Sequence, residues 1–111
     1  REGTTVTTDG GLEAAWRAAV LVADEYPPRA RDPARLEPHE RRTLEDVQGR
    51  LRGGDRDREP YAGLSTHDCW AFAYLILRAA GEGKAEARAR LGMSDGFLDR
   101  HFGWPPDPAA P

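Results

Sequence analysis

Cysteine, lysine and long apolar runs are scarce in this sequence of 111 residues. The one cysteine cannot form a disulfide within the chain, so nothing in the sequence requires an oxidising compartment. The longest apolar run, residues 69–77, is about half as long as the roughly 20 residues that cross a bilayer. We therefore expect a cytoplasmic protein with no part in a membrane.

Large apolar side chains are also in short supply, since Leu, Ile, Val and Phe together make up 18 of the 111 residues. A share this low is typical of disordered chains when the net charge is high. Here the formal net charge is only −3, because 16 Lys and Arg residues nearly balance 19 Asp and Glu residues. The large apolar residues also cluster, which predicts a folded domain with a thin core. Apart from Val6, they fall within residues 12–22, 36–51, 64–77 and 91–102.

The helical spacing of apolar residues predicts an all-α protein, a compact bundle of four to five helices. Proline and glycine residues mark the ends of the helices. The helix over residues 66–80 is apolar on almost every side, which is typical of the centre of a bundle. The other predicted helices cover residues 9–25, 38–52, 84–91 and a short stretch that follows Ser94.

These helices predict a single domain over residues 9–104, with a loop at 53–60. A flexible N-terminus, 1–8, precedes the domain, and a Pro-rich tail, 105–111, follows it. We expect the C-terminal pair of helices to pack through Leu91, Leu98 and Phe102, and Trp104 to fold back over the bundle. The first helix is expected to pack through the apolar face of Leu12, Trp16, Ala19, Val20 and Ala23.

The start of the central helix carries residues suited to nucleophilic catalysis. Cys69 lies in the first turn, where the helix dipole can stabilise a thiolate. His67 is close in sequence, and His101 can approach in space. The run from His67 to Trp70, followed by an apolar helix, resembles the nucleophile helix of NlpC-type cysteine peptidases. The resemblance implies a cysteine-dependent hydrolase in which Cys69 acts with a histidine, although those enzymes continue into a β-sheet that this sequence does not predict.

A structural role explains the same residues without catalysis. Ser65, with Asp68 three residues later, has the spacing of a capping box at a helix N-terminus. Leu64 and Cys69 then flank the cap as a hydrophobic staple. In this interpretation Cys69 is a small core residue.

Residues 84–103 have the pattern of two short helices joined by a tight turn. Gly92 is the residue type that adopts a left-handed turn at low cost, and Ser94 is placed to cap the second helix. The stretch resembles the recognition segment of tetracycline-repressor-type regulators. That resemblance implies a helix-turn-helix that reads DNA, with Ser94, Arg90, Arg100 and His101 as the candidate contacts.

The same corner can instead be structural, with Phe97, Leu98 and Phe102 packed on the central helix. Asp95 and Asp99 would face DNA phosphates and be repelled by them. The interleaved charges of residues 29–59 are typical of a solvated face, so they indicate no nucleic-acid patch.

No recognised zinc-ligand spacing and no phosphate-binding loop occur, so we expect no metal and no cofactor. Three classes of function follow, in order of preference. The first is a non-enzymatic regulatory or protein-interaction module that binds a protein partner or itself, because no complete catalytic set is present. The second is a DNA-binding regulator that uses residues 84–103, and the third is a hydrolase built on Cys69.

Overall fold

The computed structural model describes residues 11–53, 65–94 and 96–104, with only the helical backbone at 51–53. These residues form five α-helices, two short 3-10 turns and no strand, which confirms the all-α prediction. The segments predicted as an N-terminus at 1–8, a loop at 53–60 and a tail at 105–111 lie outside the described residues, except that residue 53 ends a helix. The elements are α1 (Leu12–Glu25), η1 (Pro28–Ala30), η2 (Pro33–Arg35), α2 (Pro38–Gly53), α3 (Thr66–Ala79), α4 (Lys84–Leu91) and α5 (Phe97–Phe102).

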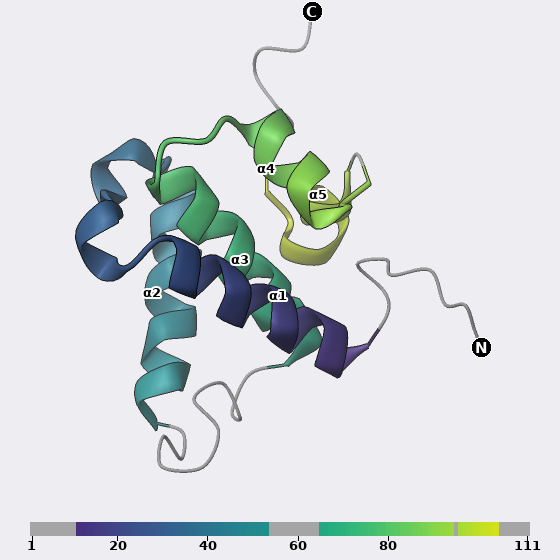
Figure 1. Cartoon of the computed structure of the whole chain (residues 1–111). Coiled ribbons are helices and arrows are strands. Elements are labelled where there is room, and N and C mark those ends of the chain that lie inside the picture. Colours follow the sequence, from purple (N-terminus) through teal and green to yellow (C-terminus); the bar gives the residue numbers. More distant parts are fainter. Residues whose placement is uncertain (1–10, 54–64, 95, 105–111) are drawn as a thin grey trace, which may run out of the picture.

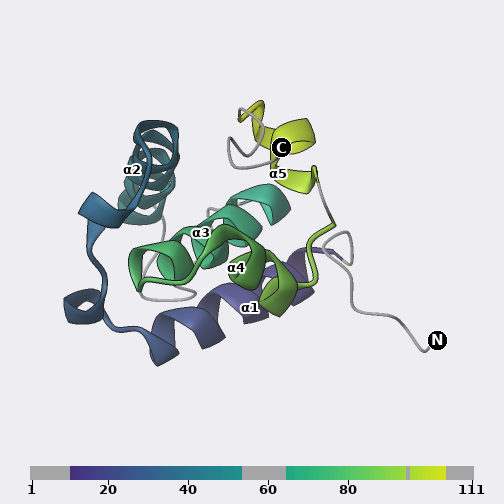
Figure 2. The same ribbon diagram turned by 90° about the horizontal axis from the view of Figure 1, so that it is seen from above.

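Helix α3 lies at the centre of the fold, with the other four helices arranged around it (Figure 1, Figure 2). Every side chain from Cys69 to Leu77 is buried, so α3 has no solvent-facing side over this stretch. A helix that is apolar all round is stable only when its neighbours cover it. The central position predicted for this helix is confirmed.

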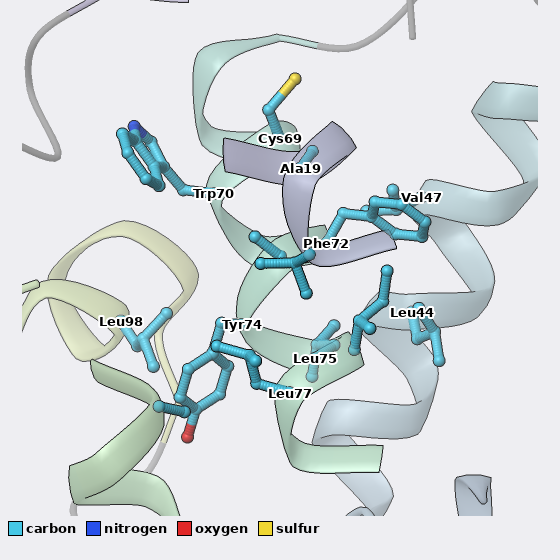
Figure 3. Close-up of a cluster of buried hydrophobic side chains, with 14 of the residues drawn as sticks. Ala19, Leu44, Val47, Cys69, Trp70, Phe72, Tyr74, Leu75, Leu77 and Leu98 are labelled. Atoms are coloured by element: carbon cyan, nitrogen blue, oxygen red, sulfur yellow. The ribbon is translucent and has the colours of Figure 1, made fainter. Parts of the chain in front are cut away.

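Helix α1 packs on α3 through small residues. Ala15, Ala19 and Val22 are buried, and Figure 3 shows Ala19 among the core residues of α3. The predicted face is wrong for Leu12, which is exposed, whereas Trp16 and Ala23 are partly buried against the core. Alanine lets two helices approach closely, so Ala15 and Ala19 allow α1 to lie near α3.

The N-terminus of α3 has the predicted capping box. The Ser65 Oγ accepts a hydrogen bond from the Asp68 backbone N–H at 3.1 Å, and the Asp68 carboxylate accepts one from the Ser65 N–H at 3.4 Å. The same carboxylate accepts two hydrogen bonds from Arg50, at 3.0 and 2.8 Å, which join α2 to α3. Leu64, the other half of the predicted staple, lies outside the described residues.

The turn between α4 and α5 contains the predicted left-handed glycine. Gly92 has φ +70°, and the Met93 N–H donates to the Arg88 carbonyl at 2.9 Å, the long bond of a Schellman motif. The prediction that Ser94 caps α5 is wrong. The N-cap is Gly96, also left-handed with φ +81°, and the Ser94 carbonyl accepts from the Phe97 N–H at 3.1 Å. A second tight turn therefore delays the start of α5.

The C-terminal end of the domain packs back on the bundle as predicted. Phe97 and Leu98 are buried, while Leu91 and Phe102 are partly buried against the same core. Trp104 is buried, and its indole N–H donates to the Thr43 hydroxyl of α2 at 3.2 Å. The short segment that ends at Trp104 therefore packs against both α2 and α3.

Candidate functional site

Cys69, the candidate nucleophile, is completely buried on α3. Burial deprives a thiolate of water, and the Asp68 carboxylate beside it repels negative charge, so the pKa of the Cys69 thiol is raised to about 11. Activated cysteines have the opposite features, a lowered pKa and access to solvent. These surroundings favour the structural interpretation of Cys69.

The two candidate histidines come together although they are far apart in sequence. The ring centroids of His67 on α3 and His101 on α5 lie 4.2 Å apart, with 38° between the planes. Both side chains are exposed, and Phe97 lies 4.4 Å from the His101 ring. Within the described residues, neither imidazole is hydrogen-bonded to Cys69. The structure therefore forms a histidine pair on the surface and leaves the cysteine in the core.

Arg90, one of the candidate DNA contacts, is held by carboxylates of its own chain. Its guanidinium pairs with Glu25 of α1 at 2.6 Å and with Glu82, which precedes α4. The Tyr26 hydroxyl completes the cluster and donates to Glu82 at 3.1 Å. The two carboxylates raise the pKa of Arg90 further above its usual range, so its charge is committed to joining α1 to α4. To reach a phosphate, this side chain would have to give up both ion pairs.

The other three DNA candidates lie at α5. Ser94 and Arg100 are exposed, and the Arg100 guanidinium donates to the Ser94 hydroxyl at 3.3 Å. His101 is exposed but in ring contact with His67. The structure thus brings Ser94, Arg100 and His101 to one short helix and places Arg90 in a separate ion-pair cluster.

Helix α1 has an arrangement of apolar residues that the sequence analysis missed. Leu12 is 51% exposed and Leu21 is 62% exposed, and they are the large hydrophobic residues most open to solvent in the described part of the chain. Trp16 and Val20 are half-buried. Between the flanks that carry Leu12 and Leu21 runs a narrow polar stripe, in which Arg17 pairs with Glu13 at 3.1 Å. The core side of α1 therefore carries Ala15, Ala19 and Val22, while Leu12 and Leu21 lie open to solvent.

A hollow of about 340 Å³ lies between α2 and the segment that follows α5. His39 and Trp104 contact each other in its wall, with ring centroids 5.1 Å apart and 59° between the planes. Arg42 and Asp46 bring one charge of each sign to the same hollow. Its lining is completed by Thr43, Phe102 and Gly103. The Thr43 hydroxyl donates to the His39 carbonyl at 3.1 Å and accepts from the Trp104 indole, so its hydrogen-bonding capacity is used within the fold.

Sequence reasoning also missed Glu40, the buried charged residue of the described core. It is 1% exposed, and its carboxylate accepts from the Glu37 backbone N–H at 2.9 Å and from the Tyr74 hydroxyl at 3.4 Å. Together with Arg78, these donors satisfy both oxygens of the Glu40 carboxylate. Glu40 therefore joins α2 to α3. In the sequence Glu40 lies among other charged residues, so the pattern gives no sign that it is buried.

In the described ranges, no three His, Cys, Asp or Glu side chains gather in an arrangement that could hold a metal ion. None of the helices found there is long and apolar enough to cross a membrane. Comparison of the chain with protein-family models, with curated proteins and with solved structures finds no match.

Proposed function

We propose that this domain is a non-enzymatic interaction module that associates with a second copy of itself through the outer surface of α1. The observation that carries the proposal is the exposure of two large apolar side chains on this helix. Ala15, Ala19 and Val22 face the core, whereas Leu12 and Leu21 are exposed. Large apolar groups on a surface helix favour association, because burying them removes apolar area from water.

The polar stripe of α1 suits pairing with a copy of the same helix. Glu13 and Arg17 carry opposite charges four residues apart. In an antiparallel pair of α1 helices centred at Ala15, Glu13 of one copy lies opposite Arg17 of the other, and Leu12 lies opposite Ala18. In such a two-fold interface each negative charge meets a positive charge of the other copy. The charges therefore attract each other and fix how the two helices are aligned.

Light scattering across a range of protein concentrations tests this proposal. We expect the mass to rise from 12.3 kDa toward twice that value as the concentration increases. The double variant Leu12→Gln/Leu21→Gln should remain monomeric, because glutamine keeps helix propensity and removes the apolar surface. Ala85→Gln, at an exposed position of α4, is the matched control and should associate like the original chain.

Charge exchange tests the register of the pair. Glu13→Arg alone should weaken association, because it places like charges opposite each other. Glu13→Arg combined with Arg17→Glu should restore it. A chain that stays monomeric at millimolar concentration would overturn the proposal.

DNA binding through the α4–α5 corner is the second candidate. Its support is the Schellman turn at Gly92, which joins the two helices as the resemblance to a helix-turn-helix implies, and the exposure of Ser94 and Arg100. An electrophoretic shift on random duplex DNA at low salt should then appear and weaken as salt is added. Arg100→Ala should reduce the shift, whereas Arg17→Ala on α1 should not. No shift at low salt would exclude this function.

A further inference from the structure

We propose that His67 and His101 together form a binding site for a divalent transition-metal ion such as Zn²⁺ or Ni²⁺. The two residues come from different helices, α3 and α5, and are 34 positions apart in the sequence. Their ring centroids are 4.2 Å apart. Imidazole nitrogen is a preferred ligand of these ions, which explains the choice of metal over Mg²⁺ or Ca²⁺.

The separation of the rings suits shared coordination. A zinc–nitrogen bond is about 2.0–2.1 Å long, so two nitrogens on one tetrahedral ion lie roughly 3.4 Å apart. With the centroids 4.2 Å apart, rotation about the side-chain bonds can turn one nitrogen of each ring toward a common ion. Both imidazoles are exposed, so water can complete the coordination.

The surroundings hold the two rings on one side and leave the other open. Phe97 lies 6.2 Å from the His67 ring and 4.4 Å from the His101 ring, and Phe102 lies 6.3 Å from His67. The neighbouring Asp68 carboxylate is occupied by Arg50 and by the capping box. The protein therefore supplies two ligands, and the expected affinity is that of a two-histidine chelate.

Metal binding at this pair would fix α5 to α3. Helix α5 has only six residues, Phe97–Phe102, and the described structure holds it to the bundle chiefly through its buried side chains. An ion shared between His67 and His101 adds a link between the start of α3 and the last turn of α5. Since the unfolded chain does not hold the two residues together, the ion stabilises the folded state.

The test is calorimetric titration of the purified chain with NiCl₂ and, separately, with ZnCl₂. We expect one metal ion per chain and an unchanged mass in light scattering. At a free metal concentration ten times the Kd, the unfolding equilibrium constant should fall about elevenfold, measured by urea denaturation. Undetectable binding of both metals would overturn the proposal, and so would one ion per two chains with a doubled mass.

Three single variants assign the site, because the chain has three histidines. His67→Gln and His101→Gln should each raise the Kd at least about tenfold, since losing a direct ligand costs no less than losing a residue that supports one. Each should also abolish the metal-dependent shift in urea midpoint. His39→Gln is the matched control and should leave both measurements unchanged. Binding that survives in the His67 and His101 variants would place the metal elsewhere and overturn the proposal.

Discussion

The carboxylate of Glu40 accepts two hydrogen bonds from the guanidinium of Arg78, at 3.2 Å from Nε and 3.3 Å from Nη2. The pair joins the first turn of α2 to the last turn of α3. Glu40 stands where the α2 dipole favours a negative charge, and Arg78 where the α3 dipole favours a positive one. The helix dipoles therefore stabilise the two charges of the buried ion pair, and the ion pair joins the N-terminal end of α2 to the C-terminal end of α3.

Removing Glu40 should destabilise the fold strongly. In Glu40→Ala the Arg78 guanidinium loses its charged partner while it stays largely buried, and it keeps only the Glu82 carbonyl. We expect a loss of about 3 kcal/mol in the free energy of unfolding, at the low end for a broken buried pair. Urea denaturation measures it.

Glu45→Ala is the control for this measurement, because Glu45 is an exposed acid on the same helix. Its effect should stay within about 0.5 kcal/mol. Glu40→Gln keeps a hydrogen-bond acceptor and loses the charge. Its loss of unfolding free energy should lie between those of Glu40→Ala and Glu45→Ala. A cost near that of Glu45→Ala would show that the Glu40–Arg78 pair contributes no stability.

Features with a local cause could be predicted from the sequence. The capping box depends on Ser65 and Asp68 alone, and the left-handed turn depends on the absence of a side chain at Gly92. The cap of α5 was missed because the tight turn at Gly96 moves the helix start beyond Ser94. In each case a few neighbouring residues determine the geometry.

Features that need distant residues could not be predicted. Glu40 lies in a stretch of exposed charges, and only the position of α3 buries it. The contact of His67 with His101 and the ion pair of Arg90 with Glu25 also depend on how helices far apart in sequence are placed. On α1, Trp16, Ala19 and Ala23 pack on the core as predicted, whereas the exposure of Leu12 depends on how far the neighbouring helices extend over that end of α1.

Cys69 should react slowly with thiol reagents in the folded protein. With a pKa of about 11, roughly 10⁻⁴ of the thiol is ionised at pH 7, against about 3% for a free cysteine. We therefore expect labelling by a disulfide reagent to be at least about 300-fold slower than for a free thiol. In denaturant the rate should return to that of a free thiol. Rapid labelling of the folded chain would instead support the hydrolase hypothesis.

The raised pKa of Cys69 also predicts a dependence of stability on alkaline pH. The folded value, about 11, exceeds the reference value of 9.0, so the folded state holds the proton more tightly. The corresponding stability is fully present below pH 9 and is lost as the pH rises toward 11. Cys69→Ala should therefore lose less stability than the original chain between pH 8 and pH 10, by urea denaturation. Equal losses would mean that the thiol ionises normally.

Ser65→Ala should cost about 1 kcal/mol, the usual effect of removing a helix N-cap. The lost bond is the one from the Asp68 N–H to the Ser65 Oγ. Ser94→Ala is the matched control, because Ser94 precedes a helix without capping it and its hydroxyl accepts a hydrogen bond from the exposed Arg100. Its effect on the urea midpoint should be less than half as large. Equal effects of the two substitutions would contradict the assignment of Gly96 as the cap of α5.

Alanine in place of two glycines should change stability in opposite directions. A Cβ at Gly92 or at Gly49 meets no atom within 4 Å, so neither substitution creates a clash. Gly92 has φ +70°, a conformation that costs an L-residue about 1–2 kcal/mol, so Gly92→Ala should destabilise by that amount. Gly49 lies inside α2, where alanine is favoured over glycine by about 0.5–1 kcal/mol, so Gly49→Ala should stabilise. Thermal unfolding of both variants measures whether each substitution raises or lowers the stability. A stabilising Gly92→Ala would show that the chain leaves α4 without a left-handed turn.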